Sequence, residues 1–141
     1  MNWTGWALLS AFFAGVTAIL AKMGVAGINS NLATANRTTV ILLFTWIIVF
    51  VTTKPAAIFN ISRNTMIFLV LSGMTTGLSW LFYFRALQLG EASRVAPIDK
   101  LSVIFAIALA VLILREKLTW QVGVGGLLMA AGAIIIAWGK N

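Results

Sequence analysis

The sequence predicts an all-α membrane protein with five transmembrane helices, and two observations carry this prediction. First, 61% of the 141 residues are hydrophobic and 9% are charged, whereas soluble domains are about 45–50% apolar and about 25% charged. Second, the apolar residues fall into five stretches of about 20 residues, the length that a helix needs to cross a hydrocarbon core about 30 Å thick. A soluble enzyme is therefore nearly excluded, because a chain of this length has too little interior to bury so many apolar side chains.

The five predicted spans are separated by short links that contain polar residues or glycine. We expect the spans at approximately residues 3–21, 32–52, 66–84, 95–114 and 118–138. The first link holds Gly24, Gly27, Asn29, Ser30 and Asn31. The second link opens at Lys54 and Pro55 and closes at residues 62–64; the third covers residues 90–94 and the fourth 115–117. Tryptophans favour the membrane interface, and four of them lie near span ends: Trp3, Trp6, Trp120 and Trp138.

The composition also limits the chemistry. The chain has no cysteine and no histidine, so disulfides, thiol chemistry and imidazole catalysis are absent. We therefore expect no enzyme activity, no metal site and no cofactor. The ten lysines and arginines give a net charge of +7, but they are scattered singly among apolar runs, which does not indicate a nucleic-acid partner.

Some charged residues are forced into the bilayer by span length. The uninterrupted apolar part of the second span, without charged residues, covers only residues 40–51. Twelve residues of helix rise only about 18 Å. The helix must therefore extend back through Arg37. Asp99 and Lys100 follow Pro97, which suits the first turn of a helix. They lie about 22–24 Å from the fourth link, just inside one edge of the membrane.

Lys22 and Arg85 end the first and third spans on that same side, so we expect Lys22, Arg37, Arg85, Asp99 and Lys100 to converge on one vestibule. Charges at membrane depth cost about 2.5–3.5 kcal/mol each unless they face protein or water. The functional interpretation is a path for an anionic or zwitterionic solute, with Asp99 as the candidate proton-coupling carboxylate. The alternative is that the cations reach toward the interface and that Asp99 forms one salt bridge that locks the bundle.

The third span adds polar and aromatic side chains at helical spacing, which would line the same cavity: Thr76, Ser79, Trp80 and Tyr83. Stripes of small residues predict close helix contacts. The first span has Ala7, Ala11, Ala14, Ala18 and Ala21; the fifth has Gly123, Gly126, Ala130, Ala133 and Ala137; the third has Gly73 and Gly77. These stripes indicate packing inside one bundle or, for the fifth span above all, a dimer seam.

The lysines and arginines are distributed almost evenly between the two sides of the membrane. The side of the N-terminus has four: Lys54, Arg63, Arg115 and Lys117. The other side has six, of which Arg37 and Lys100 are deep: Lys22, Arg37, Arg85, Arg94, Lys100 and Lys140. The positive-inside rule then gives almost no preference. This balance is what a chain that inserts in both directions needs, and it is also what chance produces in a short chain.

One stretch of the chain resembles a known family. Residues 80–120 read WLFYFRALQLGEASRVAPIDKLSVIFAIALAVLILREKLTW. Its "RALQLGEASRVAPIDKLS" segment and the later "REKLT…G…L…AGA" pattern resemble the EamA repeat of the drug/metabolite transporter superfamily. The resemblance extends over essentially the whole chain and is closest to small five-span prokaryotic members.

The resemblance implies half of a ten-helix inverted-repeat transporter, since typical relatives fuse two such repeats of opposite orientation with the solute site between them. It therefore implies a partner within the lipid bilayer: a second copy in an antiparallel homodimer, or a homologous inverted half. The expected function is movement of a small-molecule solute across a prokaryotic inner membrane, by alternating access. The similar small multidrug exporters carry a glutamate in the first span, which this chain lacks.

Two other functions compete with transport. One is a non-transporting membrane subunit that assembles or regulates a larger complex through its small-residue stripes. The other is an intramembrane enzyme, which would need one Asp99 from each of two chains side by side. Antiparallel copies disfavour that arrangement if Asp99 lies near one edge.

Overall fold

The computed structural model describes residues 2–54 and 60–139; Met1, Pro55 and Lys140 lie outside the described residues. Every regular element that it describes is a helix: α1 (Trp3–Gly24), α2 (Ser30–Thr52), α4 (Arg63–Leu89), α5 (Ala92–Asp99), α6 (Ser102–Ile113) and α7 (Trp120–Trp138). Five segments are long and apolar enough to cross a membrane, with α5 and α6 together forming the fourth. The predicted all-helical fold with five spans is confirmed.

The helices group into two compact units. Residues Ala21–Gln88 form what we call the α2–α4 unit, which includes the last turn of α1. Residues Met1–Leu20 and Leu89–Asn141 form the α5–α7 unit.

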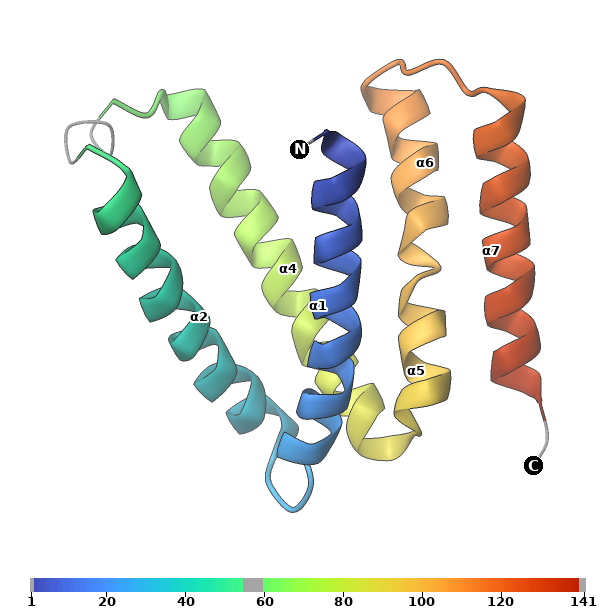
Figure 1. The fold of residues 1–141 in the computed structure, drawn as a ribbon, viewed down its shortest axis with the longest axis horizontal. Coiled ribbons are helices and arrows are strands. Elements are labelled where there is room, and N and C mark those ends of the chain that lie inside the picture. The colour runs from blue at the N-terminus through green and yellow to red at the C-terminus, as the bar shows by residue number, and fades with distance from the viewer. Residues whose placement is uncertain (1, 55–59, 140–141) are drawn as a thin grey trace. The chain divides into compact units, whose positions relative to one another are not determined.

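The core of the α2–α4 unit lies at its junction, where the last turn of α1, the link to α2 and the end of α4 meet (Figure 1). The link turns at Gly27, which adopts a φ of 79°, a conformation that glycine reaches without steric cost. Asn29 then caps α2, because its side-chain oxygen accepts from the backbone N–H of Asn31 at 2.9 Å and of Leu32 at 3.4 Å. The buried side chains around this link are Ala21, Val25, Ser30, Ala33, Thr34, Phe84 and Leu87.

The third span is longer than the sequence predicts. We expected residues 66–84, but α4 runs for 27 residues from Arg63 to Leu89. The charge of Arg85 suggested a helix end, yet Arg85 bonds to Gln88 on the same helix. Leu87, one turn further than Tyr83, is fully buried at the junction. Burial of this last turn explains why the helix continues past the charge.

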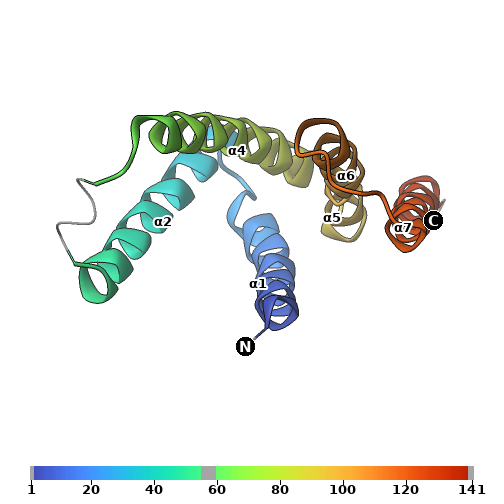
Figure 2. The same ribbon diagram turned by 90° about the horizontal axis from the view of Figure 1, so that it is seen from above.

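In the α5–α7 unit, α5 and α6 follow one another along nearly the same direction, and α7 runs antiparallel beside them (Figures 1 and 2). Helix α7 contacts both. Its small-residue stripe is its most covered face, since Gly126 and Ala133 are buried and Gly123, Ala130 and Ala137 are half-buried. A Cβ atom at Gly126 would lie 3.2 Å from Ile107 Cδ1 of α6. This arrangement favours packing inside one chain over a dimer seam for the α7 stripe.

The other small-residue positions are less covered. In the α1 stripe only Ala18 and Ala21 are buried. On α4, a Cβ atom at Gly73 or at Gly77 would meet nothing within 4 Å. The pair on α4 is therefore open to another helix or to lipid.

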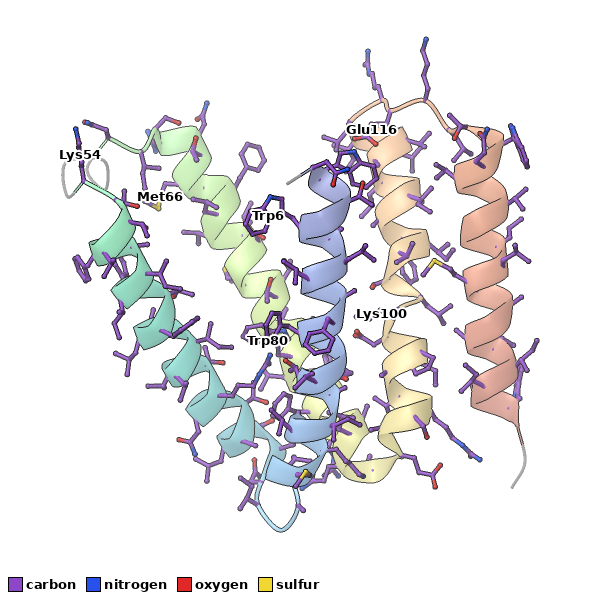
Figure 3. All side chains as sticks on the ribbon, viewed as in Figure 1. Trp6, Lys54, Met66, Trp80, Lys100 and Glu116 are labelled. Carbon is purple, nitrogen blue, oxygen red and sulfur yellow. The ribbon has the colours of Figure 1, made fainter. Side chains whose placement is uncertain are left out.

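The link between α6 and α7 covers residues 114–119 and is longer than the predicted 115–117, because α6 ends at Ile113 and α7 begins at Trp120. Arg115 adopts a φ of 55°, the left-handed conformation that often ends a helix. The backbone N–H of Glu116 then bonds to the Ala110 carbonyl at 3.2 Å, and Figure 3 shows Glu116 on this link. The reversal lets α7 return directly along α6.

Candidate functional site

The fourth span is broken, whereas the sequence predicted one helix over residues 95–114. Helix α5 ends at Asp99 and α6 begins at Ser102. Between them the backbone tightens to hydrogen bonds three residues apart, from Leu101 N–H to the Ile98 carbonyl at 2.9 Å and from Val103 N–H to the Lys100 carbonyl at 3.0 Å. No pattern in the sequence predicts this break.

The prediction that Pro97 lies in the first turn is wrong. Helix α5 begins at Ala92, so Pro97 lies inside it, two residues before its end. The earlier start follows from Glu91, whose extended backbone precedes the helix and whose carbonyl accepts from the N–H groups of Arg94 and Val95. Proline has no N–H to offer to the preceding turn, which weakens the helix at this point.

The break carries an ion pair. Lys100 Nζ lies 3.3 Å from Asp99 Oδ2, and the two side chains are 56% and 34% exposed. Figure 3 shows Lys100 at the break between α5 and α6. About 12 Å of the span lies before the break and about 18 Å after it, at 1.5 Å per residue. The pair therefore lies inside the Ala92–Ile113 segment and not in its first turn.

A second charged feature lies in the α2–α4 unit. The Arg37 guanidinium of α2 stacks 4.4 Å above the ring centre of Trp80 and lies 5.4 Å from that of Phe84. Both rings belong to α4, and Figure 3 shows where Trp80 lies on that helix. They are four residues apart, so they share one face of α4. Arginine above an aromatic face is attracted by the negative charge of the π system.

Lys22 and Arg85 have structural partners at the junction. Lys22 Nζ donates to the Leu87 carbonyl at 2.6 Å, where a cation also complements the C-terminal dipole of α4. Arg85 Nη1 donates to Gln88 Oε1 at 2.6 Å, and Gln88 Nε2 donates to the Ile28 carbonyl at 2.7 Å. These contacts tie the end of α4 to the first link.

The five charges of the expected vestibule belong to two different units, so their convergence stays a prediction. Arg37, Lys22 and Arg85 belong to the α2–α4 unit, and in it Arg37 contacts aromatic rings whereas Lys22 and Arg85 hold the junction. Asp99 and Lys100 belong to the α5–α7 unit and pair with each other.

The four residues of the predicted polar face of the third span all belong to the α2–α4 unit but have different surroundings. Trp80 contacts Arg37, and Tyr83 lies edge-on to Phe84 at 6.5 Å. The Thr76 hydroxyl donates to the Ser72 carbonyl at 2.8 Å, and Ser79 is exposed. Sequence reasoning missed Phe84 and Gln88. Their spacing was the available signal, since Phe84 follows Trp80 by four residues and Gln88 follows Arg85 by three.

The α5–α7 unit also has an apolar groove between α6 and α7. Its volume is about 310 Å³, and its walls include Ile104, Ile107, Val111, Val122 and Gly126. It holds no polar side chain that could orient a solute. Within the described residues, no three His, Cys, Asp or Glu side chains lie together as a metal site would require.

Comparison with known proteins agrees with this architecture. The family model "EamA-like transporter family" matches residues 1–138. A protein from Sinorhizobium sp. described as "Uncharacterized transporter in cobO 3'region" is 51% identical over 136 residues, which are 96% of each chain. No solved structure matches the chain. Because the family model matches nearly the full length and a relative of similar size is 51% identical, this multi-pass membrane protein belongs to the EamA-like transporter family.

Proposed function

We propose that the chain is one half of a secondary transporter for a small metabolite in a prokaryotic cell membrane. Two copies inserted in opposite directions would form the complete transporter. The family and the relative that is named a transporter support a transport role. Alternating access, in which one half moves against the other, is the general mechanism of carriers built from inverted repeats.

The observation that carries the proposal is the broken fourth span with its ion pair. Irregular backbone at membrane depth is tolerated only where it is covered by protein or lines a water-filled cavity. Carriers place such interruptions beside the solute and the coupling ion. Here the interruption coincides with Asp99 and Lys100, which are both partly exposed. A pair that only locked the helices together would be better covered than this.

The antiparallel homodimer is supported by size and charge. The family model covers the chain once, over residues 1–138, and the Sinorhizobium relative is similar in length. Transporters of the inverted-repeat type need two halves of opposite orientation. A two-fold axis in the membrane plane would relate two antiparallel copies, and four cations against six leave little bias against dual insertion.

In this proposal Asp99 is the coupling carboxylate. It is the acidic residue inside a span; Glu91 lies on the link between α4 and α5, and Glu116 on the link between α6 and α7. Lys100 balances its charge while the solute is absent. Solute or proton binding would then weaken the ion pair between Asp99 and Lys100. The interruption of the α-helix between Asp99 and Ser102 would allow α5 and α6 to move separately.

The experiment is transport in proteoliposomes that contain a defined mixture of amino acids, sugars, organic acids and nucleosides under an imposed pH gradient. Mass spectrometry measures which solutes accumulate. We expect at least one solute to accumulate with the wild type and with Glu116→Gln, but not with Asp99→Asn. Accumulation by Asp99→Asn would remove Asp99 from the mechanism. If no solute moves with the wild type, and an unrelated membrane protein co-purifies stably, the chain is an assembly or regulatory subunit instead.

A further inference from the structure

The Arg37 guanidinium has an unusual environment for a charge within a membrane span. Counted from Ser30, Arg37 lies about 10 Å along α2, and counted from Leu87, Trp80 lies about 10 Å along α4. Both helices therefore place this contact at the same height above the junction. The guanidinium carbon lies over the rings of Trp80 and Phe84, so the side chain is directed across to α4.

Among the described residues, no hydrogen bond joins the Arg37 guanidinium to a carboxylate or a carbonyl; its charge interacts with Tyr83 of α4 and with the rings of Trp80 and Phe84. Arginine carries five N–H donors in its plane, more than a contact with two rings engages. The rest of the unit offers no carboxylate, because residues 21–88 contain no aspartate or glutamate. A guanidinium in this position is costly unless an acceptor comes from elsewhere.

The neighbouring polar groups are satisfied in other ways. Thr34, Thr38 and Thr39 donate their hydroxyl hydrogens to carbonyls one turn earlier in α2, a common solution for threonine in apolar helices. Lys22 and Arg85 donate to the Leu87 carbonyl and the Gln88 amide. Arg37 differs from Lys22 and Arg85 because, in the part of the unit that the structure describes, its guanidinium donates no hydrogen bond to a carbonyl or an amide.

We propose that Arg37, held against Trp80 and Phe84, binds the carboxylate of a monocarboxylate solute with an apolar body. The planar fork of a guanidinium matches the two oxygens of a carboxylate. One available cation balances one negative charge, whereas a phosphate dianion would need a second cation, and the donors of Lys22 and Arg85 have partners. The aromatic rings beside the guanidinium offer contact area to the apolar part of the solute. This inference rests on the proposed transport function, since it names the solute class for that function.

The test is equilibrium binding to the purified protein in detergent, which does not require transport. Benzoate is the probe; benzamide has nearly the same shape without the charge, and inorganic phosphate is the second comparator. We expect benzoate to bind saturably to the wild type and benzamide to bind about 10- to 100-fold more weakly, because the neutral amide lacks the charge-assisted hydrogen bonds that a carboxylate accepts from a guanidinium. The comparison of the two ligands uses the wild type, so it does not depend on the folding of any variant.

Variants then assign the site. Arg37→Gln should weaken benzoate binding by a similar factor, and Arg37→Lys should restore only part of it because the fork is lost. Trp80→Leu should weaken binding by removing the platform. The matched control is Arg63→Gln at the exposed first residue of α4, which should bind benzoate as the wild type does.

Three results would overturn the proposal: equal affinity for benzoate and benzamide, preference for phosphate, or unchanged benzoate binding in Arg37→Gln. If Arg37→Gln instead loses a co-purifying anionic phospholipid and benzoate never binds, Arg37 is a lipid headgroup site. Benzoate binding without flux of any solute would keep this inference and remove the transport function. Flux of solutes that carry no carboxylate, without benzoate binding, would keep the transport function and remove this inference.

Discussion

The lysine at the end of α1 shows how a charge near a span end can hold the fold. Lys22 Nζ reaches the Leu87 carbonyl of α4 across 65 positions of sequence, beside the fully buried Leu87 and Val25 side chains. Its ammonium therefore connects two helix ends and satisfies one of the last carbonyls of α4.

Replacing this lysine should lower stability more than it lowers transport. Lys22→Met removes a charged hydrogen bond, which costs about 1.5–3 kcal/mol, so we expect a lower melting temperature in detergent. Lys117→Met, in the exposed link between α6 and α7, is the matched control and should melt as the wild type does. Loss of flux with an unchanged melting temperature would instead place Lys22 in the solute path.

At the residue scale, the sequence was sufficient to place Arg37 inside the second span, because an apolar run of residues 40–51 is too short to cross. It was not sufficient to separate Arg37 from Lys22 and Arg85. Lys22 bonds to Leu87, which lies 65 positions away, and Gln88, the partner of Arg85, bonds to Ile28, which lies 60 positions away. No spacing rule within one helix predicts such contacts.

Helix α7 illustrates packing at the scale of elements. Gly126 faces α6, where an added Cβ would approach Ile107 Cδ1 to 3.2 Å and Ile104 Cδ1 to 3.4 Å. At the adjacent Gly125 the same atom would meet nothing within 4 Å. Two neighbouring glycines therefore have opposite tolerance for a side chain.

We expect Gly126→Leu to destabilise the protein by about 1–3 kcal/mol, the usual cost of overpacking, while Gly125→Leu has little effect. The measurement is the melting temperature of each purified variant in the same detergent. Equal destabilisation by both substitutions would show that Gly126 does not pack against α6. Unchanged stability with loss of the dimer in Gly126→Leu would assign the stripe to a dimer seam.

The spans themselves could be predicted because length and apolarity are properties of contiguous sequence. The break in the fourth span could not, since each half of Ala92–Ile113 is an acceptable helix and Pro97 is equally suited to a first turn. The same holds for the end of α4, where burial of Leu87 against the junction extends the helix past Arg85.

At the scale of the whole molecule, the chain leaves most of its large apolar side chains exposed. Helix α6 has no buried residue, and Phe105 and Leu112 are 70% and 75% exposed. Lipid covers such surfaces without cost, so association of helices depends on close packing instead. The open Gly73 and Gly77 pair on α4 is one surface that a second copy would be able to use.

The central claim is that two copies of this chain act together in opposite orientations. Because the chain has no cysteine, a single introduced one reports topology cleanly. Thr119 is exposed on the link between α6 and α7, carries no charge and makes no capping hydrogen bond with its side chain. Thr119→Cys therefore leaves the charge balance between the two sides unchanged.

The most direct measurement is labelling of Thr119→Cys with a membrane-impermeant maleimide in sealed right-side-out vesicles, before and after permeabilisation. Dual insertion predicts that about half of the protein is labelled in sealed vesicles and the remainder only after permeabilisation. Labelling of all or none of the protein before permeabilisation would mean one fixed orientation and would contradict the antiparallel homodimer.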